Sequence, residues 1–468
     1  MDQPAVNIAG GGLAGALMAV LLARRGIRVN LFERRPDPRV HRADAGRSIN
    51  LALAARGIRA LEHAGLMPQI RPLMLPMRGR MIHEPRAESA PRLLPYGQRD
   101  SEVIYSVGRA ALNRVLIEAA ARLPLVQLRF ETPCTGVDPA LGTLQFLDAR
   151  SGVPGTLAHS VTIATDGAGS TLRGSLARAG HLTVADEPLE HGYKELTMAP
   201  RAGAYALNPE ALHVWPRHGF MLIALPNPDR SFTATLFLPH AGTPGFETLR
   251  TDAAVQAFFA REFATAADLI PDLATQFREH PQGQLGSIHA QPWACGSVLL
   301  MGDAAHAIVP FHGQGMNAAF EDCALLDAML DEDAGAPDWP ALFTRFDRSR
   351  REDAEAIGRM ALENYAEMRS SVLDERFLRH KNWALQLERL HPEAFIPRYA
   401  MVMFHPEISY AQALRRGAAQ QQILDLLDAR RQQDGAGSGP ELNAAELRYA
   451  AALIAETTAA QTAYPKPR

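Results

Sequence analysis

A glycine-rich turn close to the start of the chain constrains the fold more than any other feature. Gly10, Gly12 and Gly15 form a GxGxxG pattern between an apolar run typical of a strand and an Ala- and Leu-rich segment typical of a helix. A second apolar run follows and ends at Glu33, which completes one βαβ unit. The first glycine permits a tight turn, the second lets backbone approach a pyrophosphate, and the third lets the helix pack against the strand. This segment predicts a Rossmann-type dinucleotide-binding fold.

The same segment indicates how a dinucleotide would bind. The helix N-terminus offers free N–H groups to phosphate, and Glu33 stands about 20 residues after the turn, where an acidic side chain can bind ribose hydroxyls. Without a ligand, the glycines would form a tight turn only, and Glu33 would be a solvated strand end. The pattern does not choose between NAD and FAD.

Composition excludes several other classes of protein. With 47% apolar and 21% charged residues over 468 positions, the chain can bury large cores, and its net charge of −3 gives no argument for nucleic acid or an anionic membrane. The three widely spaced cysteines form no ligand pattern, so we expect no metal. The sequence shows no signal-peptide features and no apolar stretch of roughly 20 residues, so we expect a cytoplasmic protein.

A second glycine-containing segment decides between the two cofactors. Met301–Ala307 follows a buried apolar strand and opens a helix, and Gly313–Asn317 comes shortly after it. Asp303 can bind a ribityl hydroxyl, while Gly313 and Gly315 let backbone approach a flat ring. The new helix N-terminus can stabilise negative charge on reduced flavin. This segment predicts FAD.

Rossmann-like pieces recur near residues 5–60, 105–175 and 296–330, with sheet-like or loop material between them. One dinucleotide-binding domain with a second domain inserted into it explains this order better than two sequential domains. We therefore predict an α/β fold with a Rossmann-type FAD-binding domain, an inserted β-sheet substrate domain and a C-terminal helical region. The predicted ranges are 1–75, 105–180 and 291–335 for the FAD-binding domain, 76–104 and 181–290 for the substrate domain (short strands at 204–207, 221–225 and 232–238), and 336–468 for the helical region.

The order of these motifs, with Asp166-Gly167 between them, resembles the aromatic-hydroxylase class of FAD monooxygenases. In that class the Asp-Gly segment also serves the passage of NADPH, and no separate nicotinamide domain exists; this sequence likewise shows no second GxGxxG. Arg109 matches an arginine that contacts flavin there, although an arginine at a helix start otherwise belongs to a surface ion pair. The resemblance implies FAD contacts from Gly10, Gly12, Leu13, Gly15, Glu33, Arg34, Ala52, Arg109, Asp166, Gly167, Asp303, Gly315, Met316 and Asn317, and no catalytic residue beyond flavin positioning by Phe311, His312, Gly313 and Gln314.

A finer resemblance, to the kynurenine 3-monooxygenase family, covers most of the chain. The strings GRSINLAL at 46–53 and HGYKEL at 191–196 are rare. His312 replaces a residue that is often aromatic in the family. The other matching stretches are 78–83, 95–97, 301–323, 364–369 and 395–399.

This resemblance implies a substrate site. Arg80 would pair with the carboxylate of L-kynurenine, assisted by the hydroxyls of Tyr96 and Tyr399. Without the resemblance, Arg80 would belong to a solvated basic loop, and Tyr399 would be an ordinary core residue. The remaining implied contacts are a hydrogen bond from Asn364 and apolar walls from Phe237, Phe311 and Met368.

The resemblance also implies a mechanism. NADPH reduces FAD, and O₂ then adds to form a flavin C4a-hydroperoxide, which hydroxylates L-kynurenine at ring carbon 3 to 3-hydroxykynurenine. His306 belongs to the flavin-loop motif and has no carboxylate partner visible in the sequence, so we assign it no catalytic role. The alternatives are the same chemistry on another aromatic acid, such as a hydroxybenzoate, and a non-catalytic flavoprotein that serves as a binding module.

The C-terminal segment decides whether we expect attachment to a membrane. Ala444–Thr458 is Ala-rich and is interrupted by Glu446, Arg448 and Glu456. We therefore expect a soluble helix without a membrane anchor. The sequence leaves the oligomeric state open, with a homodimer as one option.

Overall fold

The computed structural model describes residues 5–41, 50–85, 90–332, 337–370, 374–434 and 439–462. The rare string at 46–53 is therefore described only from Asn50 onward, and its first four residues lie outside the described part of the chain.

A six-stranded sheet contains the predicted βαβ unit. Its order is β18-β19-β12-β1-β2-β8, and every neighbouring pair is parallel except β18 and β19. Helix α1 (Leu13–Arg24) follows the glycine turn, and nine of its twelve residues are buried, as expected of a crossover helix in a doubly wound sheet. The Rossmann-type fold is confirmed. The strands are β1 (Val6–Ala9), β2 (Val29–Phe32), β8 (Val126–Arg129), β12 (Val161–Ala164), β18 (Ala294–Cys295) and β19 (Val298–Leu300).

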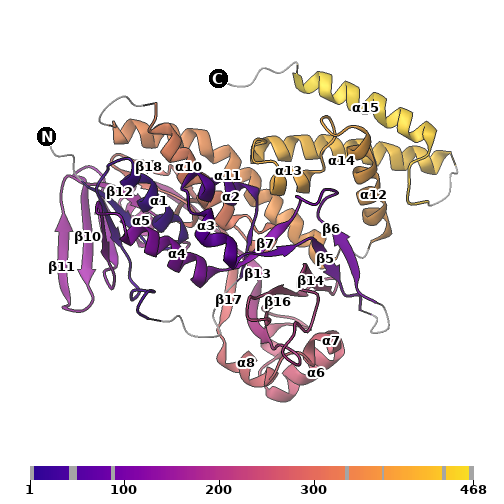
Figure 1. Ribbon diagram of the computed structural model, residues 1–468, viewed down its shortest axis with the longest axis horizontal. Helices are drawn as coiled ribbons and strands as arrows, with labels where there is room; N and C mark the ends of the chain where they lie inside the picture. Colours follow the sequence, from indigo (N-terminus) through magenta and orange to yellow (C-terminus); the bar gives the residue numbers. More distant parts are fainter. Residues whose placement is uncertain are drawn as a thin grey trace.

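A seven-stranded sheet forms the second layer, in the order β17-β13-β16-β15-β14-β5-β6. Neighbouring strands are antiparallel except β14 and β5. Helices α6 (Asp252–Glu262), α7 (Ala264–Ala267) and α8 (Leu273–Glu279) lie together at the lower end of this sheet (Figure 1), with a phenylalanine-rich core between them. The strands are β5 (Gly79–Ile82), β6 (Arg92–Pro95), β13 (Thr183–Met198), β14 (Ala211–Pro216), β15 (Met221–Pro226), β16 (Phe232–Pro239) and β17 (Gln282–Gln291).

Two small antiparallel sheets complete the strands. One, in the order β3-β7-β4, consists of β3 (Asn50–Leu53), β7 (Ile104–Gly108) and β4 (Leu75–Met77). The other is a meander at the outer edge of the molecule (Figure 1), made of β9 (Cys134–Asp138), β10 (Thr143–Asp148) and β11 (Val153–Leu157).

The first large sheet thus draws its strands from the ranges assigned to the FAD-binding domain, and the second from the two substrate-domain ranges, with β17 ending one residue beyond 290. The exact domain boundaries stay a prediction. The strand expected at 204–207 is wrong: this segment is irregular, and only an isolated bridge joins Arg201 to Ala204. Pro and Gly residues around it favour turns over a ladder.

The C-terminal region is helical, as predicted, and lies along the upper right of the molecule in Figure 1. Its longest member, α11, packs against β18 and β19 of the first sheet and β14 of the second. It also packs against the helices α10 (Gly315–Met329) and α14. No helix in the described part of the chain is long and apolar enough to cross a membrane. The helices are α11 (Trp339–Arg369), α12 (Glu375–Leu390), α13 (Arg398–Phe404), α14 (Tyr410–Gln433) and α15 (Ala444–Thr462).

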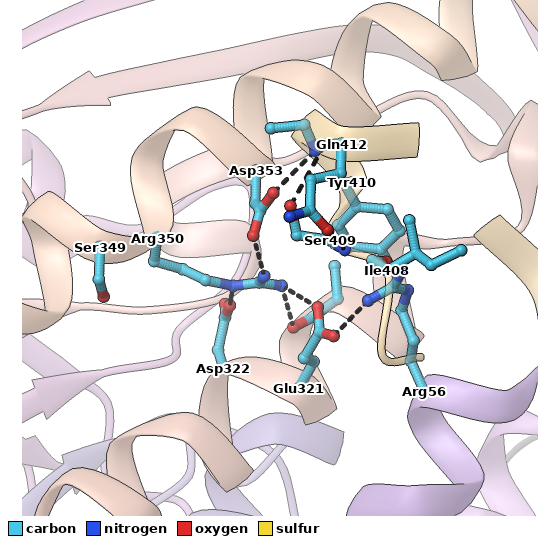
Figure 2. Close-up of polar contacts among 12 residues, drawn as sticks. Arg56, Glu321, Asp322, Ser349, Arg350, Asp353, Ile408, Ser409, Tyr410 and Gln412 are labelled. Atoms are coloured by element: carbon cyan, nitrogen blue, oxygen red, sulfur yellow. Dashed lines mark hydrogen bonds and ion pairs between the residues drawn. The ribbon is translucent and has the colours of Figure 1, made fainter. Parts of the chain in front are cut away.

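A buried charge cluster joins α11 and α14 to α10 and to the helix that carries Arg56 (Figure 2). Arg350 of α11 is 3% exposed; its Nε donates to Asp322 Oδ1 at 2.6 Å, and its Nη2 lies 2.6 Å from Glu321 Oε2. Glu321 also pairs with Arg56 of α2 (Ala55–His63) at 2.5 Å. The ring of Tyr410, first residue of α14, lies 4.0 Å from the guanidinium carbon of Arg56 and 5.6 Å from that of Arg350. Segments far apart in sequence therefore share one set of charges.

Asp322 is fully buried at the centre of this cluster. Burial alone would raise the pKa of Asp322, but His306 and Arg350 outweigh it and lower that pKa from 3.8 to about 2. The carboxylate is therefore ionised at neutral pH, and it stabilises the folded state wherever the unfolded chain would also be ionised.

We predict that Asp322→Asn destabilises the protein by about 3–5 kcal/mol at neutral pH, because Arg350 loses a buried counterion. The stabilisation that the ionised Asp322 gives to the folded wild-type protein is fully present above the unfolded pKa of 3.8. It is lost as the pH falls toward the folded pKa of about 2. Denaturant unfolding at a series of pH values measures both effects.

The matched control is Asp331→Asn, since Asp331 pairs with Arg25 at the surface. Its substitution should change the free energy of unfolding far less. An equal loss in the two variants would show that the buried cluster contributes no more than a surface ion pair.

Candidate active site

A cavity of about 420 Å³ lies where the first sheet's loops, the second sheet's inner face and helix α13 meet. It is lined by eight of the predicted cofactor residues, three of the flavin-positioning residues and five of the predicted substrate residues. Cofactor and substrate residues therefore share one continuous space. The lining members are Gly12, Leu13, Ala52, Arg109, Gly167, Asp303, Gly315 and Met316; Phe311, His312 and Gly313; and Arg80, Tyr96, Phe237, Met368 and Tyr399.

The other predicted residues, Gly10, Gly15, Glu33, Arg34, Asp166, Gln314, Asn317 and Asn364, do not line this cavity. Most of them contact residues that do.

The three glycines of the first turn meet different surroundings. Gly10 has a φ of +101°, and a Cβ there would lie 2.5 Å from the carbonyl oxygen of Thr165. A Cβ on Gly15 would lie 2.0 Å from the carbonyl oxygen of Gly10. A Cβ on Gly12 would meet nothing within 4 Å, because Gly12 faces the cavity. Two glycines thus pack the turn, and the middle one opens onto the space for a ligand.

Three helix N-termini face the cavity with free backbone donors. Gly12, Arg109 and Gly315 lie at the starts of α1, α4 (Arg109–Ala121) and α10. No side chain caps these helices, and their first turns hold no acidic residue. Free N–H groups and a positive dipole end suit a pyrophosphate and an electron-rich ring. With the exposed carboxylate of Asp303 beside them, these donors fit FAD.

Glu33 lies behind the glycine turn. Its Oε2 accepts the N–H of Gly11 at 2.8 Å, and its Oε1 accepts the backbone N–H and the Nε of Arg35 at 2.9 and 3.0 Å. Oε1 accepts two hydrogen bonds and Oε2 only one, so Oε2 retains a lone pair that a ribose hydroxyl can use. Arg34 is exposed beside it. Ribose binding by Glu33 stays a prediction.

Asp166 and Asn317 hold backbone close to the cavity. Asp166 accepts hydrogen bonds from Ser170 Oγ at 2.5 Å and Leu172 N–H at 3.2 Å, so it stabilises the start of α5 (Thr171–Arg178). Asn317 Nδ2 donates to the carbonyls of Ala52 and Gly313, both at 2.8 Å. Asn317 thus positions backbone that lines the cavity, and Asp166 joins the segment before Gly167, which also lines it, to α5.

The substrate end of the cavity centres on Arg80 of β5, which is 4% exposed. Its Nη1 donates to Glu367 Oε1 at 2.7 Å and its Nη2 to Asn364 Oδ1 at 3.1 Å, both on α11. Its Nε is buried without a hydrogen-bond partner in the structure. A buried, unpaired donor on a charged group is costly unless a ligand satisfies it. This end of the cavity therefore suits an anion.

Aromatic rings surround Arg80. Its guanidinium carbon lies 4.9 Å from the centre of the Tyr399 ring, which stacks on Tyr96 at 5.5 Å and on His312 at 5.2 Å. Burial, with a smaller effect from Arg80 and Arg398, lowers the pKa of His312 to about 3, so its ring is neutral. Burial raises the pKa of both tyrosines, so their hydroxyls stay protonated. The site therefore offers neutral tyrosine hydroxyls beside the permanent positive charge of Arg80.

An apolar wall stands next to this group. Phe311 packs edge-on to Phe237 at 4.9 Å and stacks on Tyr365 at 3.8 Å. Asn364 Nδ2 donates to the carbonyl of Phe311 at 2.6 Å, so Asn364 connects α11 to this wall.

One sequence argument is wrong. The imidazole of His306 does have a carboxylate partner, since its Nε2 lies 2.7 Å from Asp322 Oδ2. The two residues stand 16 positions apart and meet only because α10 folds back over the short helix α9 (Asp303–His306). The same carboxylate oxygen accepts the Gly302 N–H at 3.3 Å, so Asp322 contacts both ends of α9.

Sequence reasoning missed two further residues at the site. Glu367 pairs with Arg80, and its spacing of three from Asn364 on one helix face could have pointed to it. Glu195 of β13 lines the cavity, where burial raises its pKa. Glu195 could have been predicted from Tyr193, because residues two positions apart on a strand point to the same face of the sheet. Both side chains line the cavity.

Comparison with known proteins agrees with this geometry. The FAD binding domain family matches residues 3–360. A kynurenine 3-monooxygenase of Stenotrophomonas maltophilia is 46% identical over 421 residues, covering 90% of this chain and 91% of that protein. Another, of Xanthomonas axonopodis pv. citri, is 45% identical and covers 91% of this chain and 92% of that protein.

The chain belongs to the kynurenine 3-monooxygenase family. As a member of this family it is an FAD-dependent aromatic monooxygenase, as the sequence predicts, and FAD is its cofactor. Solved structures of other oxygenases share its fold. The p-nitrophenol 4-monooxygenase of Pseudomonas putida DLL-E4 aligns with a TM-score of 0.63 at 19% identity, covering 91% of this chain and 97% of that one. A 2-methyl-3-hydroxypyridine-5-carboxylic acid oxygenase gives 0.62 at 18%, covering 82% and 97%.

We predict that alanine at two glycines of the first turn affects two different properties, apoprotein stability at one and FAD binding at the other. Gly15→Ala should destabilise the apoprotein by about 1–3 kcal/mol or more, because its Cβ would overlap backbone. Gly12→Ala should leave apoprotein stability within about 0.5 kcal/mol of wild type but weaken FAD binding, because its Cβ enters the cavity. Denaturant unfolding and FAD titration measure the two effects. A Gly12→Ala variant with wild-type FAD affinity would contradict the placement of the dinucleotide against this turn.

Proposed function

We propose that the chain hydroxylates L-kynurenine at ring carbon 3, using NADPH and O₂, to give 3-hydroxykynurenine. The observation that carries this proposal is the buried Arg80, whose Nε has no hydrogen-bond partner. It lies in a cavity that is also lined by the loop Gly313–Asn317, which we call the flavin loop. The relatives named kynurenine 3-monooxygenase support the same assignment.

FAD would be held by the glycine turn, Asp303 and the Gly313–Asn317 loop. When bound, it accepts a hydride from NADPH and activates O₂ for transfer to an aromatic ring. Arg80 is paired with Glu367, which does not itself line the cavity, and the His312 ring is neutral. The chain's own contribution is therefore to bind and orient the ring and to exclude water.

The charges at the substrate end suit an amino acid. Arg80 would bind the α-carboxylate, with the hydroxyls of Tyr96 and Tyr399 as further donors. Glu367 lies 2.7 Å from Arg80 and provides a negative charge for the α-ammonium group. Phe237, Phe311 and Met368 would contact the aromatic ring. A zwitterion matches this pair of charges better than a benzoate, which has only the negative one.

This argument separates the proposal from its alternatives. A hydroxybenzoate hydroxylase would consume NADPH faster with benzoates than with kynurenine. A non-catalytic flavoprotein would be yellow and show no substrate-dependent oxygen uptake. Product analysis after incubation with kynurenine, NADPH and air separates the proposal from both alternatives, since only the proposed enzyme gives 3-hydroxykynurenine.

We predict that Arg80→Ala lowers kcat/KM for kynurenine about 100-fold, equal to about 2.7 kcal/mol, mainly through KM, because the carboxylate loses a charge-assisted bond. NADPH oxidation over a range of kynurenine concentrations measures this. The control is Arg78→Ala, two residues away on the protein surface and paired with Glu210, which should stay within about twofold of wild type. Wild-type turnover with wild-type affinity in Arg80→Ala would refute the carboxylate assignment.

A further inference from the structure

The side chain of Gln314 points away from the cavity that its neighbours line. The backbone of Gly313 and Gly315 lines the cavity. Gln314 lies between them in sequence but does not line the cavity, and its side chain is fully buried. Its Oε1 accepts a hydrogen bond from the hydroxyl of Tyr410 at 2.8 Å. Its Nε2 donates to the Sδ of Met403 at 3.0 Å.

Both partners of Gln314 belong to the C-terminal helices. Met403 lies on α13, the helix that also carries Tyr399, and Tyr410 begins α14. The flavin loop is thus held by a region that follows the whole FAD-binding domain in sequence.

Tyr410 is itself held from several sides (Figure 2). Its ring lies between the guanidinium groups of Arg56 and Arg350, at 4.0 and 5.6 Å. Arg56 also donates to the carbonyl of Ile408, and Asp353 accepts the N–H of Ala411 at 2.8 Å. Burial raises the pKa of Tyr410, so its hydroxyl remains a donor. The position of that hydroxyl is therefore fixed by charges on α2 and α11.

The loop needs such support because its own backbone is permissive. Gly313 has a φ of +66°, and glycines flank Gln314 on both sides. Within the loop, Gln314 and Asn317 carry the side-chain hydrogen bonds to other elements.

We propose that Tyr410 is a positioning residue for the flavin loop, which acts through Gln314 and touches neither cofactor nor substrate. The inference rests on the proposed flavin chemistry of this loop. Loss of the hydroxyl frees the Gln314 amide, and the cavity-lining backbone of Gly313 and Gly315 is then less well ordered around the ring. FAD affinity and the flavin spectrum depend on Tyr410 as a result.

Tyr410→Phe tests this inference, because it keeps the ring between the two arginines and removes only the hydroxyl. We expect FAD to bind about tenfold more weakly, which corresponds to about 1.4 kcal/mol. We also expect a shifted visible flavin spectrum and a larger share of NADPH oxidation that reduces O₂ to H₂O₂ without hydroxylating the substrate, with the KM for kynurenine unchanged. FAD release from the diluted holoenzyme and absorbance of the bound flavin measure the first two.

A double-mutant cycle with Gln314→Met separates this role from a general structural one. If Tyr410 acts through Gln314, the double variant binds FAD no more weakly than Gln314→Met alone. Tyr205→Phe is the matched control: the Tyr205 hydroxyl donates to the Asn227 carbonyl at 2.8 Å, outside the flavin loop, and this variant should bind FAD as wild type does.

Three outcomes overturn the inference: wild-type FAD affinity and spectrum in Tyr410→Phe, additive losses in the double variant, or wild-type FAD binding by Gln314→Met. The last applies even if Tyr410→Phe does not fold. Failure of the proposed function is distinguishable, because a wild-type protein that binds FAD without hydroxylating kynurenine still allows the cycle to be measured.

Discussion

The contact between Arg350 and Asp322 is the one on which the rest of the structure depends. Two charges removed from water are stable only when their geometry and their remaining hydrogen bonds are complete. Here Asp322 accepts from His306, from the Gly302 N–H and from Arg350, and Arg350 also pairs with Glu321. The partners come from α9 with its preceding Gly302, from α10 and from α11, so none of these segments can be fully stable alone. The cofactor domain and the helical region therefore stabilise each other.

Much of the first sheet could be predicted from the sequence because its causes are local. Gly10 and Gly15 have no room for a Cβ, so the turn determines its own residues. The buried strands on either side are continuous apolar runs. The second sheet was harder, because its strands owe their extent to partners. The first half of β13 is mostly exposed and contains Asp186 and Glu187, yet it pairs with β17. No local pattern marks such a strand.

The site divides in the same way. Glycines and Asp303 stand out in sequence because the chemistry of a dinucleotide demands them. Arg80, Tyr96 and Tyr399 were found through a family resemblance, and the structure places them within one cavity. The partners of these residues were missed: Glu367 and Asp322 resemble ordinary helical acids until the fold brings Arg80 and His306 beside them. Gln314 was grouped with the residues that face the flavin, although its side chain contacts the C-terminal helices.

The pairing of β13 with β17 has a consequence for how such an enzyme can diversify. The two strands form a long antiparallel ladder with a register shift between Pro188 and Gly192, and the Ile288 N–H of β17 donates to the carbonyl of Ala307 beside the flavin loop at 2.8 Å. Both strands belong to the seven-stranded sheet, and the hydrogen bond from Ile288 joins this ladder to the segment that precedes Gly313–Asn317. Exchange of the whole sheet would have to preserve this contact between the two layers. Substrate range in this architecture can change readily by single substitutions on the sheet's inner face, and only with difficulty by exchange of a whole module.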